Sequence, residues 1–190
     1  MSKTKNELQV KKALKYAKSL VDIPYIWWKD DESNPTDIFY ADTFPSKTIL
    51  KKRGINCAGL INLMRQSIGK EIIHAPGKYC IGKYRGGTGY WYNILRKAKK
   101  LKPFDYNTDY PIGTLFLRRY KNIKDQGHVA VLYKKNKKYP KHLLYSEIIH
   151  SFYQNKDFNG VKITSLGKSH FFLPEGYYEF AILPQHWLLN

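Results

Sequence analysis

Hydrophobic positions recur with a helical period in the first half of the chain. Over residues 6–21, apolar residues return every three or four positions and lysines lie between them, which predicts an amphipathic helix that ends by Pro24. The same spacing predicts a second helix over 57–69, where Gly69 is a typical C-terminal stop, and a short third helix over 90–99.

The second half of the chain has the pattern of β-strands. Short segments rich in β-branched and aromatic residues alternate with turn residues, as in an antiparallel sheet. Helices followed by strands indicate an α+β fold. The predicted strands cover 114–118, 128–133, 143–150, 161–165 and 177–183.

Two long connections interrupt these elements. The segment 29–46 is acidic in an otherwise basic chain, and loops of this length are often lids or binding loops. The segment 77–89 is rich in glycine and is also predicted as a loop. Because we find no repeat and no linker, we expect one domain over 1–190.

Composition excludes several classes of protein. At 190 residues with 43% hydrophobic and 25% charged residues, the chain has the composition of a globular domain. Two cysteines and no CxxC pair exclude a disulfide-dense scaffold and give no start for a zinc site. No apolar run approaches the roughly 18 residues of a membrane-spanning helix. The first 15 residues lack the apolar region of a secretory signal, so an intracellular or virion-associated protein is expected.

The formal net charge of +18 suggests an anionic partner such as nucleic acid or a membrane surface. An AT-rich genome would enrich lysine, asparagine, isoleucine and tyrosine without any such partner. Neither explanation is excluded, because the basic runs lie in no recognisable nucleic-acid-binding module. The densest runs lie in a lysine-rich stretch at 134–142 and around 96–102.

The segment Gly54-Ile55-Asn56-Cys57-Ala58-Gly59-Leu60 places a cysteine at a predicted helix start. Unpaired backbone N–H groups and the helix dipole stabilise a thiolate there. The same N–H groups can donate to an oxyanion, and the small residues beside Cys57 leave room for a carbonyl group. A small buried hydrophobic residue is the alternative explanation for Cys57.

Two histidines complete a possible catalytic set. His128 follows Gly127 and opens an apolar strand, a position that suits a general base. His150 closes the next predicted strand, from where its ring could orient the first imidazole as the third member of a triad does.

These segments together resemble the NlpC family of papain-like cysteine peptidases, best known as bacterial cell-wall endopeptidases. The resemblance rests on order and spacing over roughly residues 8 to 155. The matching stretches are Pro24-Tyr25-Ile26-Trp27, Asn56-Cys57-Ala58-Gly59-Leu60, Pro111-Ile112-Gly113-Thr114-Leu115, His128-Val129-Ala130-Val131 and Ile149-His150-Ser151.

The resemblance implies a compact papain-like fold with a central antiparallel sheet and the cysteine at the N-terminus of a packed helix. It implies Cys57 as nucleophile, His128 as base, His150 as orienting residue and Tyr25 as the tyrosine whose hydroxyl lies near the cysteine. Trp27, Asn56 and Ala58 are the candidate substrate-binding residues. Asn56 and Ala58 replace the family's Asp and Ser, which puts recognition of a free amine in doubt, and Thr114 replaces the Asp of the Pro-Gly-Asp motif.

We therefore predict a thiol-dependent hydrolase that cleaves an amide or related acyl bond of a peptide or acyl substrate and needs no metal or organic cofactor. Two alternatives stay open. One is a lipid acyltransferase or deacylase of the lecithin–retinol acyltransferase group, although that group has its histidine before the cysteine. The other is a basic, non-catalytic protein that binds nucleic acid or belongs to a virion.

Overall fold

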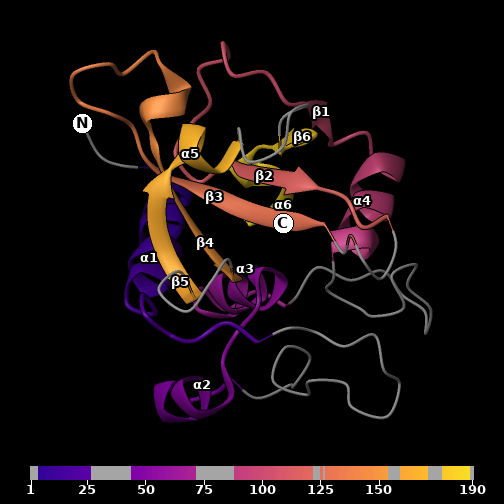
Figure 1. Cartoon of the computed structure of the whole chain (residues 1–190). Helices are drawn as coiled ribbons and strands as arrows, with labels where there is room; N and C mark the ends of the chain where they lie inside the picture. The colour runs from indigo at the N-terminus through magenta and orange to yellow at the C-terminus, as the bar shows by residue number, and fades with distance from the viewer. Residues whose placement is uncertain are drawn as a thin grey trace.

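A six-stranded antiparallel sheet forms the centre of the computed structural model, which describes residues 4–26, 44–71, 88–121, 125, 127–153, 159–170 and 177–188 (Figure 1). Within these residues the strand order is β1-β6-β2-β3-β4-β5. The strands are β1 Lys102–Pro103, β2 Leu115–Arg118, β3 His128–Lys134, β4 Glu147–Tyr153, β5 Asn159–Ser165 and β6 Phe180–Ile182. Together with the helices they confirm the predicted α+β class.

The helices predicted from periodicity are present with shifted ends. The first helix, α1 (Lys5–Lys18), begins with a capping box in which the Thr4 hydroxyl accepts from the Glu7 N–H and the Glu7 carboxylate accepts from the Thr4 N–H. The other α-helices of the described chain are α2 Lys47–Arg53, α3 Cys57–Gln66, α4 Thr88–Lys97, α5 Leu166–His170 and α6 Pro184–Trp187.

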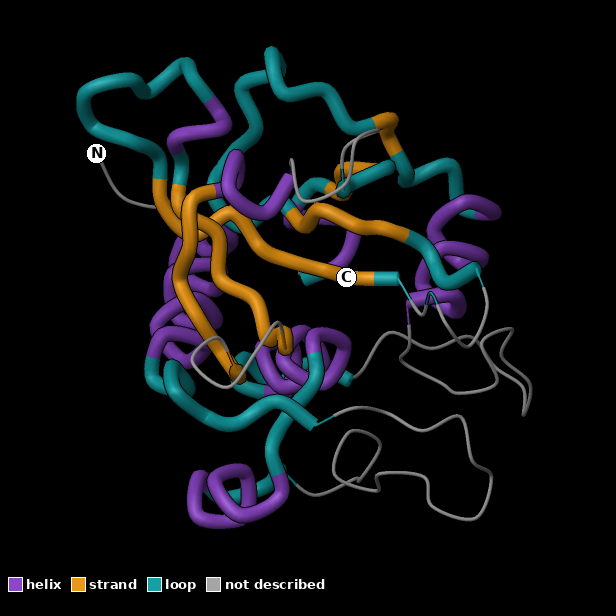
Figure 2. The backbone as a smooth tube through the Cα atoms, viewed as in Figure 1, coloured by secondary structure: helices purple, strands orange, loops and turns teal. Residues whose placement is uncertain are grey.

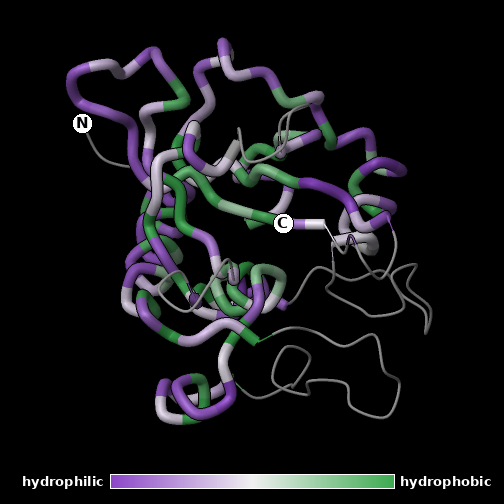
Figure 3. Tube along the Cα trace, viewed as in Figure 1, coloured by the Kyte–Doolittle hydropathy of each residue, from purple (hydrophilic) through white to green (hydrophobic). Residues whose placement is uncertain are grey.

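The alternation along the strands builds two separate hydrophobic clusters, one on each face of the sheet. Leu117 pairs with Val129 and belongs to the cluster that includes α1 and α3. Phe116 pairs with Ala130 and belongs to the second cluster, which includes Tyr178. The tube colouring shows the apolar character of β2 and β3 between these layers (Figures 2 and 3).

The two central strands separate at one end of the sheet. The pairing of β3 with β4 runs from Lys134 and Glu147 only as far as Val131 and Ile149, and beyond this point β4 runs towards α3 whereas β3 turns away from it (Figure 1). The hydroxyl of Ser151 donates to the Ile55 carbonyl at 2.6 Å, which fixes the start of α3 to the diverging part of β4. The candidate site lies beside this divergence.

Several predicted boundaries are wrong. The segment predicted as a strand over 143–150 begins with a 3₁₀ turn at Leu143–Tyr145, and the strand then continues to Tyr153. His150 therefore lies inside β4 and does not close it. The predicted strand over 177–183 is reduced to Phe180–Ile182. Most of the acidic segment 29–46 and most of the segment 77–89 lie outside the described residues.

Four short elements were not predicted: α2, α5, α6 and β1. None is longer than seven residues, so none offers enough positions for a periodic pattern to be recognised. Among the described helices, none combines the length and apolar character that a membrane span requires.

Candidate active site

Cys57 is the first residue of α3 and is almost completely buried, with 8% of its surface exposed. Asn56 caps the helix, since its side-chain Oδ1 accepts from the Gly59 N–H at 2.7 Å. Three backbone N–H groups, those of Cys57 itself, Ala58 and Val129, lie close enough to the Cys57 sulfur to lower the pKa of the thiol. The last of these belongs to the part of β3 that has diverged from β4, so the sulfur lies beside the strand that begins with His128.

Burial dominates the electrostatics of this thiol. It raises the pKa of Cys57 to about 11, against the lowering effect of the three N–H groups and of the Arg118 guanidinium. The donors expected at a helix N-terminus are thus present. The local sequence pattern suggested that these donors stabilise a thiolate. They do not make Cys57 a thiolate at neutral pH, because the desolvation of the charged sulfur outweighs them.

His128 and His150 are brought together by the sheet. Nε2 of His128 lies 3.0 Å from Nδ1 of His150, and both side chains are buried. The second ring nitrogen of His150, Nε2, lies 3.0 Å from the Thr164 hydroxyl on β5, and its ring stacks on Phe152 with centroids 4.3 Å apart. Both nitrogens of His150 therefore have partners, and Nδ1 of His128 is the ring nitrogen left to face another group.

Both histidines are held neutral by their environment. Burial lowers the pKa of His150 to about 3. Burial, the neighbouring His150 and the positive charge of Arg118 keep the pKa of His128 well below its usual range. A neutral imidazole can accept a proton, which is the state that a general base requires.

Three tyrosines, Tyr25, Tyr177 and Tyr178, lie near the thiol. Burial raises the pKa of Tyr25, and a negative charge on Cys57 raises it further. The Tyr25 hydroxyl therefore lies close enough to the sulfur for an electrostatic interaction. A negative charge on Cys57 also raises the pKa values of Tyr177 and Tyr178. The ring of Tyr177 contacts the ring of His128, with centroids 5.2 Å apart. The sequence singled out Tyr25 but missed Tyr177 and Tyr178, because no local pattern relates residue 177 to residue 128.

Arg118 was also missed. It ends β2 directly opposite His128 in the ladder, and its guanidinium lies over the Tyr177 ring at 4.4 Å. Its Nη1 forms an ion pair with Asp125 at 2.6 Å. The sequence shows a basic residue at the end of a predicted strand. Only the register between β2 and β3 shows that this residue lies opposite His128.

The remaining predicted positions divide into described and undescribed residues. Ala58 is buried in the first turn of α3, beside the thiol. Trp27 lies outside the described residues, and so does Cys80, the second cysteine of the sequence. In the described part of the chain, no group of three or more His, Cys, Asp or Glu side chains is arranged to hold a metal ion.

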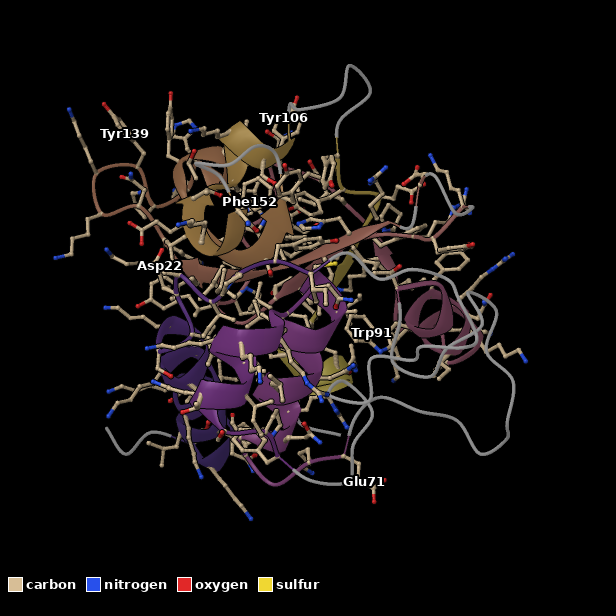
Figure 4. All side chains as sticks on the ribbon, turned by 60° about the horizontal axis from the view of Figure 1, so that its bottom comes forward. Asp22, Glu71, Trp91, Tyr106, Tyr139 and Phe152 are labelled. Carbon is tan, nitrogen blue, oxygen red and sulfur yellow. The ribbon has the colours of Figure 1, made fainter. Side chains whose placement is uncertain are left out.

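The lysine-rich stretch 134–142 lies at the other end of β3 from His128. Lys134 pairs with Glu147 at 3.5 Å, and Lys135 pairs with Asp109. The rings of Tyr139, His142 and Tyr145 pack together on the surface, and Figure 4 shows Tyr139 at the edge of the molecule, far from α3. The anionic partner suggested by the charge remains a prediction.

The fold resembles that of a crystal structure from Staphylococcus aureus subsp. aureus Mu50, a protein similar to lipoprotein and of the NLP/P60 family. The TM-score is 0.50 at 12% sequence identity; the alignment covers 96% of this chain but only 43% of the other. No family model and no curated protein matches the sequence. At this identity the comparison shows a shared fold, so the chain has a distant structural neighbour in the NLP/P60 family.

Proposed function

We propose that the protein is an NlpC-like cysteine hydrolase that cleaves an amide or related acyl bond, with Cys57 as nucleophile and His128 as general base. The observation that carries this proposal is the hydrogen bond between His128 Nε2 and His150 Nδ1, at 3.0 Å. It leaves Nδ1 of His128 for the thiol, whose pKa is lowered by the backbone N–H of the next residue, Val129. A nucleophile, a base and an orienting group are the parts of a catalytic triad.

The proposed reaction has two steps. In the first, the thiol proton passes to Nδ1 of His128, the sulfur bonds to the substrate carbonyl carbon, and the bond to the leaving amine breaks as that amine takes the proton. In the second, water gives a proton to His128 and adds to the thioester, which releases the carboxylic acid and restores the thiol. No oxidant or reductant is involved.

The neutral state of both groups agrees with this order of events. With the pKa of Cys57 raised and that of His128 lowered, the pair rests as thiol and imidazole. Proton transfer then accompanies attack, when the negative charge moves from sulfur to the carbonyl oxygen. The N–H groups at the start of α3 and the Tyr25 hydroxyl are the donors near that position.

The similarity to the NLP/P60 structure supports the proposal at the level of fold. The order of Cys57, His128 and His150 along the chain favours the NlpC arrangement over the lecithin–retinol acyltransferase group. The substrate of the neighbouring protein is not transferred to this chain, since the chain spans less than half of that protein.

An acyl-enzyme assay tests the proposal. Mixing the protein with p-nitrophenyl acetate should release a burst of p-nitrophenol equal to the enzyme concentration, and intact-protein mass spectrometry should locate one acetyl group on Cys57. Cys57→Ser and His128→Ala should abolish the burst. His142→Ala is the matched control for the second variant, because His142 is exposed and belongs to the distant surface cluster. A burst that survives Cys57→Ser would refute the proposed nucleophile.

A further inference from the structure

The hydrogen-bonded chain that starts at His128 continues past His150 to Thr164. Nε2 of His128 lies 3.0 Å from Nδ1 of His150, and Nε2 of His150 lies 3.0 Å from the Thr164 hydroxyl. Thr164 belongs to β5, which lies next to β4 at the edge of the sheet (Figure 1). Because each contact needs one donor and one acceptor, the position of the proton on one ring determines its position on the other.

The ladder between β4 and β5 holds Thr164 at this position. The two strands pair in unbroken register along their whole length. His150 is paired with Lys162, and Thr164 lies two residues further along β5 on the same face of the sheet. The Lys162 ammonium group is bound elsewhere, since its Nζ lies 2.7 Å from Oδ1 of Asp22. The register therefore presents a hydroxyl, and not an ammonium group, to the outer nitrogen of His150.

Two arrangements of protons fit these distances. In the first, Nε2 of His128 donates to His150, and Nε2 of His150 donates to the Thr164 oxygen. In the second, every bond is reversed: the Thr164 hydroxyl donates to His150, Nδ1 of His150 donates to His128, and the proton of the neutral His128 ring lies on Nδ1. Only the first arrangement leaves a lone pair on Nδ1 of His128, which is what a general base requires.

The groups at the two ends of the chain favour the first arrangement. Three backbone N–H groups already lie close to the Cys57 sulfur, so the thiol proton needs an acceptor there and not a further N–H. At the other end, the Thr164 side chain is only partly buried. Its O–H can therefore donate to solvent while its oxygen accepts from His150.

We propose that Thr164 is a positioning residue, whose hydroxyl oxygen accepts from Nε2 of His150 and thereby fixes both imidazoles in the tautomers that leave Nδ1 of His128 able to take the thiol proton. The catalytic consequence rests on the proposed function, whereas the tautomers are a property of the resting protein. When His128 takes the thiol proton on Nδ1, its Nε2 still donates to His150. No other proton in the chain has to move.

The tautomers can be measured without any turnover. Long-range ¹H–¹⁵N correlation spectra of the ¹⁵N-labelled protein distinguish a ring nitrogen that carries a proton from one that does not. At pH 7.5 both rings are neutral, because burial lowers the pKa of each. Their signals are assigned by their loss in the His128→Gln and His150→Gln variants. Both rings should carry the proton on Nε2, and a wild-type His128 protonated on Nδ1 would overturn the proposal without any variant of Thr164.

Thr164→Val keeps the shape of the side chain and removes the hydroxyl. Nε2 of His150 then loses its acceptor, and the second arrangement, which leaves a lone pair there instead of an unpaired N–H, becomes competitive. Signals of rings protonated on Nδ1 should appear for both histidines. The rate constant of the acyl-enzyme burst should fall about ten- to a hundredfold, as expected for a buried donor that loses its partner.

Two further variants separate positioning from a structural role. Thr164→Ser keeps a hydroxyl and should retain both the tautomers and the burst of the wild type. Thr114→Val is the matched control, because the Thr114 hydroxyl donates to the Pro111 carbonyl at 2.7 Å and lies before Leu115, at the end of β2 away from His128. Its tautomers and its burst rate should equal those of the wild type even where its stability is lower.

The outcomes distinguish the two proposals. Unchanged tautomers or an unchanged burst rate in Thr164→Val would overturn the positioning role, and so would a loss of rate that Thr164→Ser shares. The spectra are recorded without substrate, so they hold whether or not Cys57 forms an acyl-enzyme. A wild type with the expected tautomers but no burst would refute the hydrolase and leave the control of the two rings by Thr164 standing.

Discussion

Nε2 of His128 and Nδ1 of His150 face each other at 3.0 Å across the point where β3 and β4 cease to pair. The two strands are antiparallel neighbours, yet their ladder stops at Val131 and Ile149, and the imidazoles span the opening beyond it. The N-terminus of α3 lies beside this opening, since the Val129 N–H, in the part of β3 that no longer pairs with β4, lowers the pKa of the Cys57 thiol. The site therefore lies where the sheet opens.

The pH dependence of Cys57 alkylation should follow a raised pKa. Because burial raises the pKa of this thiol to about 11, the thiolate fraction should increase about tenfold per pH unit between pH 7 and pH 9. The measurement is the rate of iodoacetamide labelling of Cys57 by peptide mapping. A rate that is already constant across this range would instead reveal a thiolate–imidazolium pair.

Loss of His128 should reduce the rate more than replacement of His150. The base moves a proton in both steps, so His128→Ala should lower kcat by at least about 10²-fold on any working substrate. His150→Gln keeps an amide oxygen that can accept from the His128 ring, and should retain more activity. Steady-state kinetics of the two variants decide the point: a slower His150→Gln enzyme would mean that the two roles are reversed.

The buried histidines should make the protein sensitive to acid. In the unfolded chain both titrate near pH 6.5, whereas in the folded protein the pKa of His150 falls to about 3 and that of His128 lies well below its usual range. The unfolded chain thus binds more protons below pH 6.5. The stability is complete above that pH and decreases as the pH falls, by up to about 1.4 kcal/mol per pH unit for each histidine.

Urea unfolding at pH 7.5, 6.5, 5.5 and 4.5 measures this slope. His128→Gln and His150→Gln should each make it shallower, while His142→Gln, which replaces an exposed histidine, should leave it unchanged. An unchanged slope in both buried-site variants would contradict the assignment of the acid sensitivity to these two rings.

Asn56→Asp should create a preference for a free amine that the wild type lacks. The amide of Asn56 is neutral, and an ammonium group in a buried site needs a carboxylate to offset its lost hydration. Aspartate can still cap α3 through the Gly59 N–H, so the variant should fold. The measurement compares kcat/KM for one peptide with a free or an acetylated N-terminus, with an expected gain of about ten- to a hundredfold. A strong preference of the wild type for the free amine would contradict this prediction and would mean that other carboxylates bind the ammonium group.

Gly127→Ala should disturb the start of β3. At Gly127 φ is +74°, and an added Cβ would lie 2.4 Å from the Arg118 carbonyl oxygen, closer than real Cβ atoms come. Gly69 is the matched control, since its φ is +76° but nothing lies within 4 Å of the added Cβ. Each substitution incurs roughly 1–2 kcal/mol for the left-handed backbone. Gly127→Ala should also lose stability from the clash, and activity because His128 follows it.

Thermal unfolding and the acyl-enzyme burst measure the two effects. Equal losses of stability and activity in the two glycine variants would show that the contact with Arg118 is unimportant.

Much of the fold was predictable because it depends on local patterns. The spacing of apolar residues predicted α1 and α3, the latter with its start at Cys57. The apolar, β-rich segment at 128–133 predicted β3, with His128 as its first residue. Each of these features depends on side chains a few positions apart, and therefore appears in the sequence.

Only the tertiary structure decided the properties of the site. Residues 118, 128, 150 and 177 become neighbours through strand register and through the divergence of β3 from β4, which no local spacing encodes. His150 lies inside β4 because that strand continues to Tyr153, where it still pairs with Asn159 on β5. The pKa of Cys57 depends on two opposing effects, the helix N-terminus and burial. The sequence showed the first, but the second arises only when the sheet, the tyrosines and α3 together remove water from the sulfur.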